Sequence, residues 1–89
     1  MSRSTADVRW LTFRLKNGQS IGPDQLKDGW VLASESRHCD VRRERIEGAG
    51  VVYALYGPPD LPSPRRAELR MRDFLMRSGY TFTMGTLGH

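Results

Sequence analysis

The stretch from Ser63 to Ser78 reads SPRRAELRMRDFLMRS, and it carries the clearest helix signal in the chain. Ser63 is a suitable N-cap, Pro64 fits the first helical position, and Gly79 fits a left-handed C-terminal cap. Successive side chains in a helix are turned by roughly 100°, which places four apolar residues in one stripe: Ala67, Met71, Phe74 and Leu75. We therefore expect a helix over residues 63–78 that packs its apolar stripe against a sheet.

Apolar runs on both sides of this helix predict the strands of that sheet. Residues 8–15 alternate, with Leu11 and Phe13 on one face, and the strong turn signal Asn17-Gly18 follows directly. Residues 51–56, VVYALY, are β-branched and aromatic and are bounded by glycines. The expected strands are residues 8–15, 30–33, 41–47, 51–56 and 80–84, with a hairpin turn at 48–50.

The segment between the first two of these strands predicts only a short helical turn. Pro23 fits a first helical position and Gly29 fits a C-terminal stop, so the turn is confined to residues 23–29. The run from Trp30 to Ala33 is apolar throughout, and we expect it to begin the second strand.

These elements predict an α+β fold: a mainly antiparallel sheet of four to five strands with one main helix, residues 63–78, packed on one face. The chain has 89 residues, of which 38% are hydrophobic, and this supplies one thin core. Residues 1–89 are therefore expected to form a single small domain, with flexible ends at 1–7 and 85–89.

The chain is basic, with 14 Lys and Arg residues against 10 Asp and Glu residues and a net charge of +4. Of the basic residues, 12 are Arg. Arg suits forked contacts with phosphate and carboxylate, although a GC-rich genome would produce the same bias without any function. The expected kind of partner is therefore a nucleic acid or an acidic protein surface.

Arg residues in the expected helix 63–78 and in the expected strand 41–47, which is highly charged, are the candidate anion-binding residues. Arg65 and Arg66 lie in the first turn of the helix, where the helix dipole disfavours cations unless an anion binds nearby. The candidate set for nucleic-acid or anion binding is Arg42, Arg43, Arg45, Arg65, Arg66 and Arg70. Solvated surface charge is the alternative interpretation of the same residues.

A second apolar pair on the helix suggests a contact with another molecule. Leu69 and Met76 lie almost opposite the apolar stripe, and Arg72 lies on the same side. These three residues are the candidates for a partner or dimer interface. The alternative is that Leu69 and Met76 are isolated surface residues, which are common in globular proteins.

No catalytic, cofactor-binding or metal-ligating residues are expected. Cys39 is the only cysteine, which excludes an internal disulfide and a zinc site built on several thiolates. Along a strand His38 and Asp40 would share one face and Cys39 the other, so a catalytic Cys–His pair is not expected. The chain has no long apolar run and no secretory signal, so we expect a cytoplasmic protein without a membrane segment.

Residues 26–32, LKDGWVL, followed by Ser36-Arg37-His38, resemble part of the HicA family of small RNA-cleaving toxins. The resemblance implies a small double-stranded-RNA-binding-like fold and a strand-borne catalytic histidine, here His38. It is confined to residues 26–38, and a strand with an Asn-Gly turn stands where the family has its first helix. The chain is therefore not assigned to that family, and a non-enzymatic protein is expected.

Three hypotheses about function follow from these residues. The first is a non-enzymatic module that binds nucleic acid or a nucleoprotein assembly through its Arg-rich surface. The second is an accessory protein of a phage or mobile element, similar to anti-CRISPR-type inhibitors, that blocks a host protein through its Arg residues and the Leu69–Met76 pair. The third is a homodimeric adaptor joined through the helix or through the charged strand 41–47.

Overall fold

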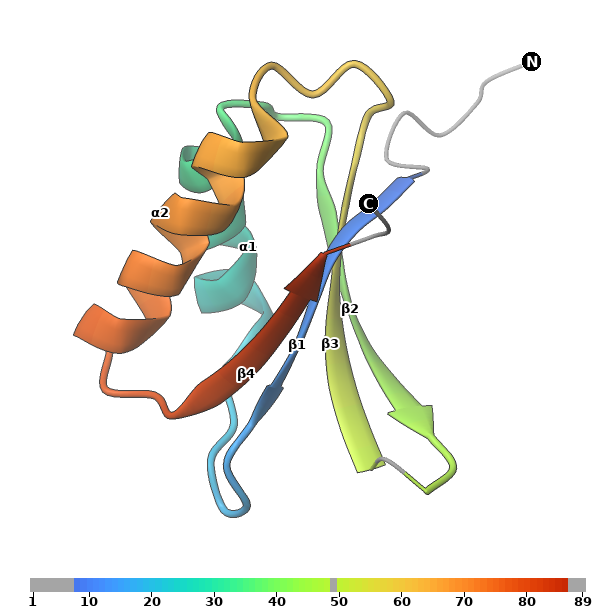
Figure 1. Ribbon diagram of the computed structural model, residues 1–89, viewed down its shortest axis with the longest axis vertical. Coiled ribbons are helices and arrows are strands. Elements are labelled where there is room, and N and C mark those ends of the chain that lie inside the picture. Colours follow the sequence, from blue (N-terminus) through green and yellow to red (C-terminus); the bar gives the residue numbers. More distant parts are fainter. Residues whose placement is uncertain (1–7, 49, 87–89) are drawn as a thin grey trace.

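The computed structural model describes residues 8–48 and 50–86, and Figure 1 shows a four-stranded sheet with two helices on one of its faces. In chain order the elements are β1 (Val8–Leu15), α1 (Pro23–Ser34), β2 (Asp40–Ile46), β3 (Gly50–Gly57), α2 (Pro64–Arg77) and β4 (Phe82–Thr86). The sheet order is β2-β3-β1-β4, and all neighbouring strands are antiparallel. The expected α+β class is confirmed, with two helices in place of one main helix.

Each helix connects two strands that are not neighbours in the sheet. α1 links β1 to β2 with β3 between them, and α2 links β3 to β4 with β1 between them. This doubled split βαβ arrangement is the ferredoxin-like topology. Both helices lie on the same side, so the other face of the sheet, called here the uncovered face, has no helix over it (Figure 1). Many unrelated functions use such a topology, so function has to be argued from the side chains.

The expected strand over residues 30–33 is wrong, because these residues form the second half of α1. Leu26, Trp30 and Ala33 are buried, and their spacing of four and three residues is that of a helix face. Leu32 lies between them in sequence and is 75% exposed. The apolar run therefore contains one outward-facing residue, and its burial follows a helical period.

The expected helix stop at Gly29 is also wrong, and packing explains why a glycine occurs there. Gly29 is buried inside α1, and a Cβ atom added to it would lie 2.7 Å from Cζ of Phe74 on α2. The missing side chain lets the two helices approach closely at this point. α1 instead ends at Glu35, which adopts a left-handed backbone conformation with φ of 60°.

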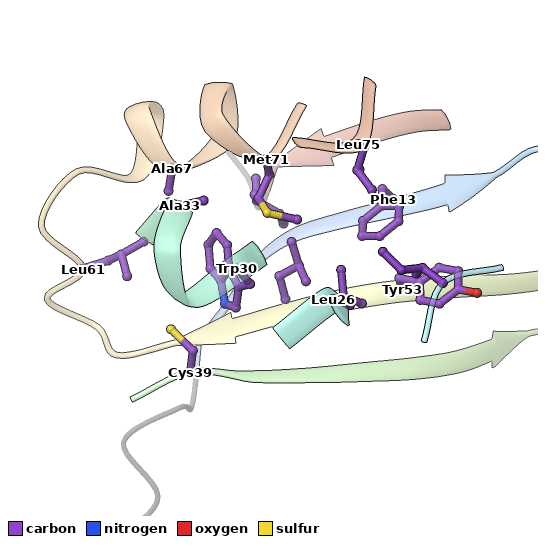
Figure 2. Close-up of a cluster of buried hydrophobic side chains, with 13 residues drawn as sticks. Phe13, Leu26, Trp30, Ala33, Cys39, Tyr53, Leu61, Ala67, Met71 and Leu75 are labelled. Atoms are coloured by element: carbon purple, nitrogen blue, oxygen red, sulfur yellow. The ribbon is translucent and has the colours of Figure 1, made fainter. Parts of the chain in front are cut away.

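The core lies between the two helices and the sheet, as the close-up in Figure 2 shows. Trp30 is fully buried, and its indole N–H donates a hydrogen bond of 2.8 Å to the backbone carbonyl of Tyr56 on β3. Phe13 on β1 stacks on Tyr53 of β3, with ring centroids 5.0 Å apart. These contacts fix β1 and β3, the two central strands, beneath the helices.

The expected helix over residues 63–78 is confirmed as α2, and Ala67, Met71 and Leu75 are fully buried. Gly79 has the expected left-handed conformation, with φ of 88°. The expected flexible tail from residue 85 is wrong for the first two residues, because β4 extends through Thr86. The expected flexible ends at 1–7 and 87–89, and the middle of the hairpin turn at residue 49, lie outside the described residues.

Candidate functional site: a basic hollow at one end of the sheet

The structure separates the six candidate Arg residues into three places. Val41 packs on the core, so the alternation of β2 places Arg43 and Arg45 on the helix side of the sheet and Arg42 on the uncovered face. Arg65, Arg66 and Arg70 lie on α2, in its N-terminal half. The six side chains therefore do not form one continuous surface.

Near the N-terminus of α2, where an anion site was expected, a carboxylate of the same chain pairs with Arg side chains of the helix. Arg66 and Arg70 both approach the same Oε2 atom of Glu35, Arg66 at 3.7 Å and Arg70 within a hydrogen bond. Glu35 lies at the C-terminal end of α1, where its backbone is left-handed with φ of 60°. Of the two Arg residues predicted for this site, Arg66 thus already has a carboxylate partner, and Arg65 has no ion pair in the described part of the chain.

Charges on the uncovered face are balanced in a similar way. The Arg42 guanidinium lies 4.6 Å from the centre of the Tyr56 ring and 3.4 Å from a carboxylate oxygen of Asp40. The Tyr56 hydroxyl donates a hydrogen bond of 3.0 Å to Glu44, which also pairs with Arg9 at 3.4 Å. This network neutralises Arg42 and removes it as a strong candidate for binding an external anion.

Of the two remaining strand residues, Arg43 lines a hollow of about 400 Å³, called here the basic hollow, and Arg45 lies beside it. Arg43 lines it together with residues 14–19, which end β1 and form the following turn, and with Gly50, Val51 and Tyr53 of β3. Arg45 pairs with Val51 and so lies on the same face, two residues beyond Arg43. The segments that line the hollow, the β2–β3 hairpin and the turn after β1, lie at the same end of the molecule in Figure 1.

The electrostatics of the basic hollow differ from those of the other basic surfaces. Its lining contains Arg14, Lys16 and Arg43, and no acidic residue among those that the structure describes. Six ion pairs neutralise Arg residues elsewhere, but Lys16, Arg43 and Arg45 have no ion-pair partner within residues 8–48 and 50–86. Lys27, Arg37 and Arg65 also have none there, but none of them lines the hollow. Side chains that lack an internal partner remain available to an external anion.

The turn that carries Lys16 is held in place by hydrogen bonds. The backbone N–H of Gln19 donates to the carbonyl of Lys16 at 2.9 Å, which closes the turn. The backbone N–H of Lys16 donates to the carbonyl of Thr81 at 2.8 Å, and the Gln19 side chain accepts from the N–H of Thr81 at 2.9 Å. Thr81, the residue before β4, thus anchors one wall of the basic hollow and fixes the backbone that presents Lys16.

A polar aromatic side chain completes the hollow. The ring of Tyr53 is buried against Phe13, whereas its hydroxyl points away from the other labelled core side chains (Figure 2). That hydroxyl has no hydrogen-bond partner in the described part of the chain. The hollow therefore combines cationic groups with one free hydroxyl donor, which is the chemistry of an anion site.

The residues considered for catalysis do not come together. His38 is exposed in the loop before β2, whereas the HicA-like resemblance implied a position on a strand. Cys39 is buried, with its sulfur 3.1 Å from the hydroxyl oxygen of Ser34. Within the described residues no three His, Cys, Asp or Glu side chains could hold a metal ion, and no helix is long and apolar enough to cross a membrane.

The candidate interface residues on α2 are only partly free. Leu69 is 57% exposed and Met76 is 66% exposed, as their positions on the helix predict. Arg72 pairs with Glu68 at 2.9 Å and donates a hydrogen bond to the carbonyl of Met84 on β4. Arg72 therefore links α2 to the sheet, and its use in an interface stays a prediction, as does pairing between two copies of β2.

Sequence reasoning missed three residues of the basic hollow: Arg14, Lys16 and Tyr53. Arg14 and Lys16 flank the end of a strand that was identified correctly, and their charge was visible in the sequence. Their proximity to Arg43 depends on β3 lying between β1 and β2, which the sequence does not reveal.

Comparison with known proteins adds nothing to this description. The chain matches no protein-family model, no curated protein and no solved structure. The functional argument therefore rests on the geometry and chemistry of its own residues.

Proposed function

We propose that this protein binds nucleic acid, without catalysis, by contacting backbone phosphates through the basic hollow. The observation that carries the proposal is that Lys16 and Arg43 line the hollow together, without an acidic residue in the described lining. Arg45 lies two residues beyond Arg43 on the same strand face. Phosphate contacts of this kind supply most of the affinity of sequence-independent nucleic-acid binding.

The arrangement of the cations favours a polymer over a single small anion. Arg43 and Arg45 are two residues apart on one strand face, which separates their backbones by about 7 Å. Lys16 approaches the same place from a different segment of the chain. A row of separated cations can contact successive phosphates at once, whereas an isolated phosphate would leave part of the row unused.

The sheet offers little for base recognition. Tyr56 is the one aromatic residue that the described strands place on the uncovered face, and Arg42 already stacks on its ring. Tyr53 at the hollow is buried by its stacking on Phe13, which leaves its hydroxyl as the accessible group. Single-strand binding proteins depend on exposed aromatic rings, so we infer that binding is through the backbone and independent of sequence.

Two variants of equal charge test the proposal. The hollow variant carries Lys16→Gln, Arg43→Gln and Arg45→Gln. The matched variant carries Lys27→Gln, Arg37→Gln and Arg77→Gln, none of which is a candidate for nucleic-acid binding. Lys27 and Arg37 are exposed, and the Arg77 side chain is 81% exposed and pairs with Asp73 on the same helix. Each variant loses one Lys and two Arg, so its net charge falls from +4 to +1.

The readout is the fluorescence anisotropy of a labelled duplex, RNA and DNA in turn, titrated at low salt. We expect the hollow variant to bind about tenfold more weakly than wild type, or worse, which corresponds to about 1.4 kcal/mol. The matched variant should stay near the wild-type affinity. Equal losses in both variants would show that only net charge matters, and absence of binding by wild type would overturn the proposal.

A further inference from the structure

The two helices form a second surface whose chemistry differs from that of the basic hollow. A groove of about 380 Å³ runs between α1 and α2, and Gly29, Leu32, Ala33 and Phe74 supply its apolar surface. We call it the helix groove. Arg70, Asp73 and Arg77 of α2 also line it.

Close approach of the two helices creates the apolar floor of this groove. Because Gly29 has no side chain, the Phe74 ring rests against the backbone of α1 and remains half-buried. Leu32 stands beside it on α1 and is 75% exposed, the highest exposure among the large hydrophobic residues that the structure describes. A single exposed leucine is common, but one beside a half-buried ring and above a groove offers a binding position for an apolar side chain.

Charge beside the helix groove indicates what kind of partner would cover it. Arg66 and Arg70 share the single carboxylate of Glu35, which leaves this cluster with one excess positive charge. Asp73 is already paired with Arg77 at 2.9 Å. The groove is therefore bordered by one positive charge in excess. A complementary partner would bring carboxylates next to an apolar side chain.

We propose that the helix groove docks an acidic amphipathic helix of a partner protein. An apolar side chain of that helix packs against Leu32 and Phe74, and its carboxylates pair with Arg66 and Arg70. A second copy of this chain would bring the same surplus of positive charge, so self-association is disfavoured. A nucleic acid would leave Leu32 and Phe74 without an apolar contact.

The position of the groove makes this inference independent of the proposed nucleic-acid site. Glu35, which pairs with Arg66 and Arg70, follows the end of α1, whereas the basic hollow includes the turn that precedes α1. Figure 1 shows these two ends of α1 at opposite ends of the helix layer. A protein with both sites could hold nucleic acid and a protein partner at the same time.

The probe for this test is a synthetic helical peptide with leucines on one face and glutamates on the other. Its control carries lysines in place of the glutamates. We expect saturable binding of the acidic peptide by fluorescence anisotropy and at least tenfold weaker binding of the control. Backbone amide shifts in NMR spectra of the labelled protein should change around Gly29, Leu32 and Phe74.

Two protein variants locate the binding position. Leu32→Gln should weaken peptide binding by about tenfold or more, because it removes the exposed apolar contact. Met76→Gln changes a similarly exposed residue that does not line the groove, and it should leave peptide binding unchanged. Both variants should retain wild-type circular dichroism and duplex binding.

Three results would overturn the inference. These are the absence of acidic-peptide binding, equal binding of the acidic and lysine peptides, and a loss of binding in Met76→Gln without a loss in Leu32→Gln. Because duplex binding is measured separately, each of these results can occur while the nucleic-acid proposal stands.

Discussion

Gly29 and Phe74 define the contact between the two helices, since a Cβ atom at Gly29 would lie 2.7 Å from Cζ of the Phe74 ring. We expect Gly29→Ala to destabilise the protein by about 1–3 kcal/mol, the usual cost of overpacking a core. This loss should appear although alanine favours a helix over glycine by about 1 kcal/mol. Urea denaturation followed by circular dichroism measures the change.

The double variant Gly29→Ala with Phe74→Leu is the control for this interpretation. The smaller side chain at 74 makes room for the new methyl group, so the Gly29→Ala substitution should cost less in that background. A Gly29→Ala protein as stable as wild type would show that the helices separate freely at this contact.

Trp30 provides a second test of the core. Trp30→Phe removes the N–H that donates to the Tyr56 carbonyl, and it leaves a void in a fully buried site. We expect a loss of about 2 kcal/mol or more in the free energy of unfolding. Trp10→Phe is the matched substitution, since the Trp10 indole N–H donates to the Pro58 carbonyl at 3.0 Å from a half-buried position. It should cost less, and the reverse order would contradict the placement of Trp30 at the centre of the core.

Glu35 tests the ion pairs at the end of α1. Its side chain and those of Arg66 and Arg70 are more than two-fifths exposed, so their attraction is screened by water. We expect Glu35→Gln to change the free energy of unfolding by less than about 1 kcal/mol, and the difference from wild type should shrink as salt is added. Thermal melts at low and high salt measure this, and a large loss that does not depend on salt would contradict it.

The two helices show which features local sequence can predict and which it cannot. Helix α2 was predictable because its caps and its apolar stripe agree. In α1 a glycine required by the contact with Phe74 looks like a stop signal, and the apolar run from Trp30 to Ala33 looks like a buried strand. Tertiary packing overrode both signals, although the spacing of Leu26, Trp30 and Ala33 was helical.

The same limit applies to the candidate site. Arg43 and Arg45 were candidates because of their charge, but their separation from Arg66 and Arg70 could not be predicted. Ion pairing with Glu35 joins residues 31 and 35 positions apart in the chain, and only the fold brings them together. Lys16 was overlooked for the corresponding reason, since its neighbour across the hollow is 27 residues away.

The salt dependence of duplex DNA binding tests the central claim most directly. The slope of log affinity against log salt is negative, and it becomes shallower by about 0.9 for each phosphate contact that is lost. If Lys16, Arg43 and Arg45 each contact a phosphate, the slope of the hollow variant should be shallower than that of wild type by about 2.7. The variant with Lys27, Arg37 and Arg77 replaced should keep the wild-type slope, and a reduced slope in that variant with an unchanged slope in the hollow variant would contradict the account.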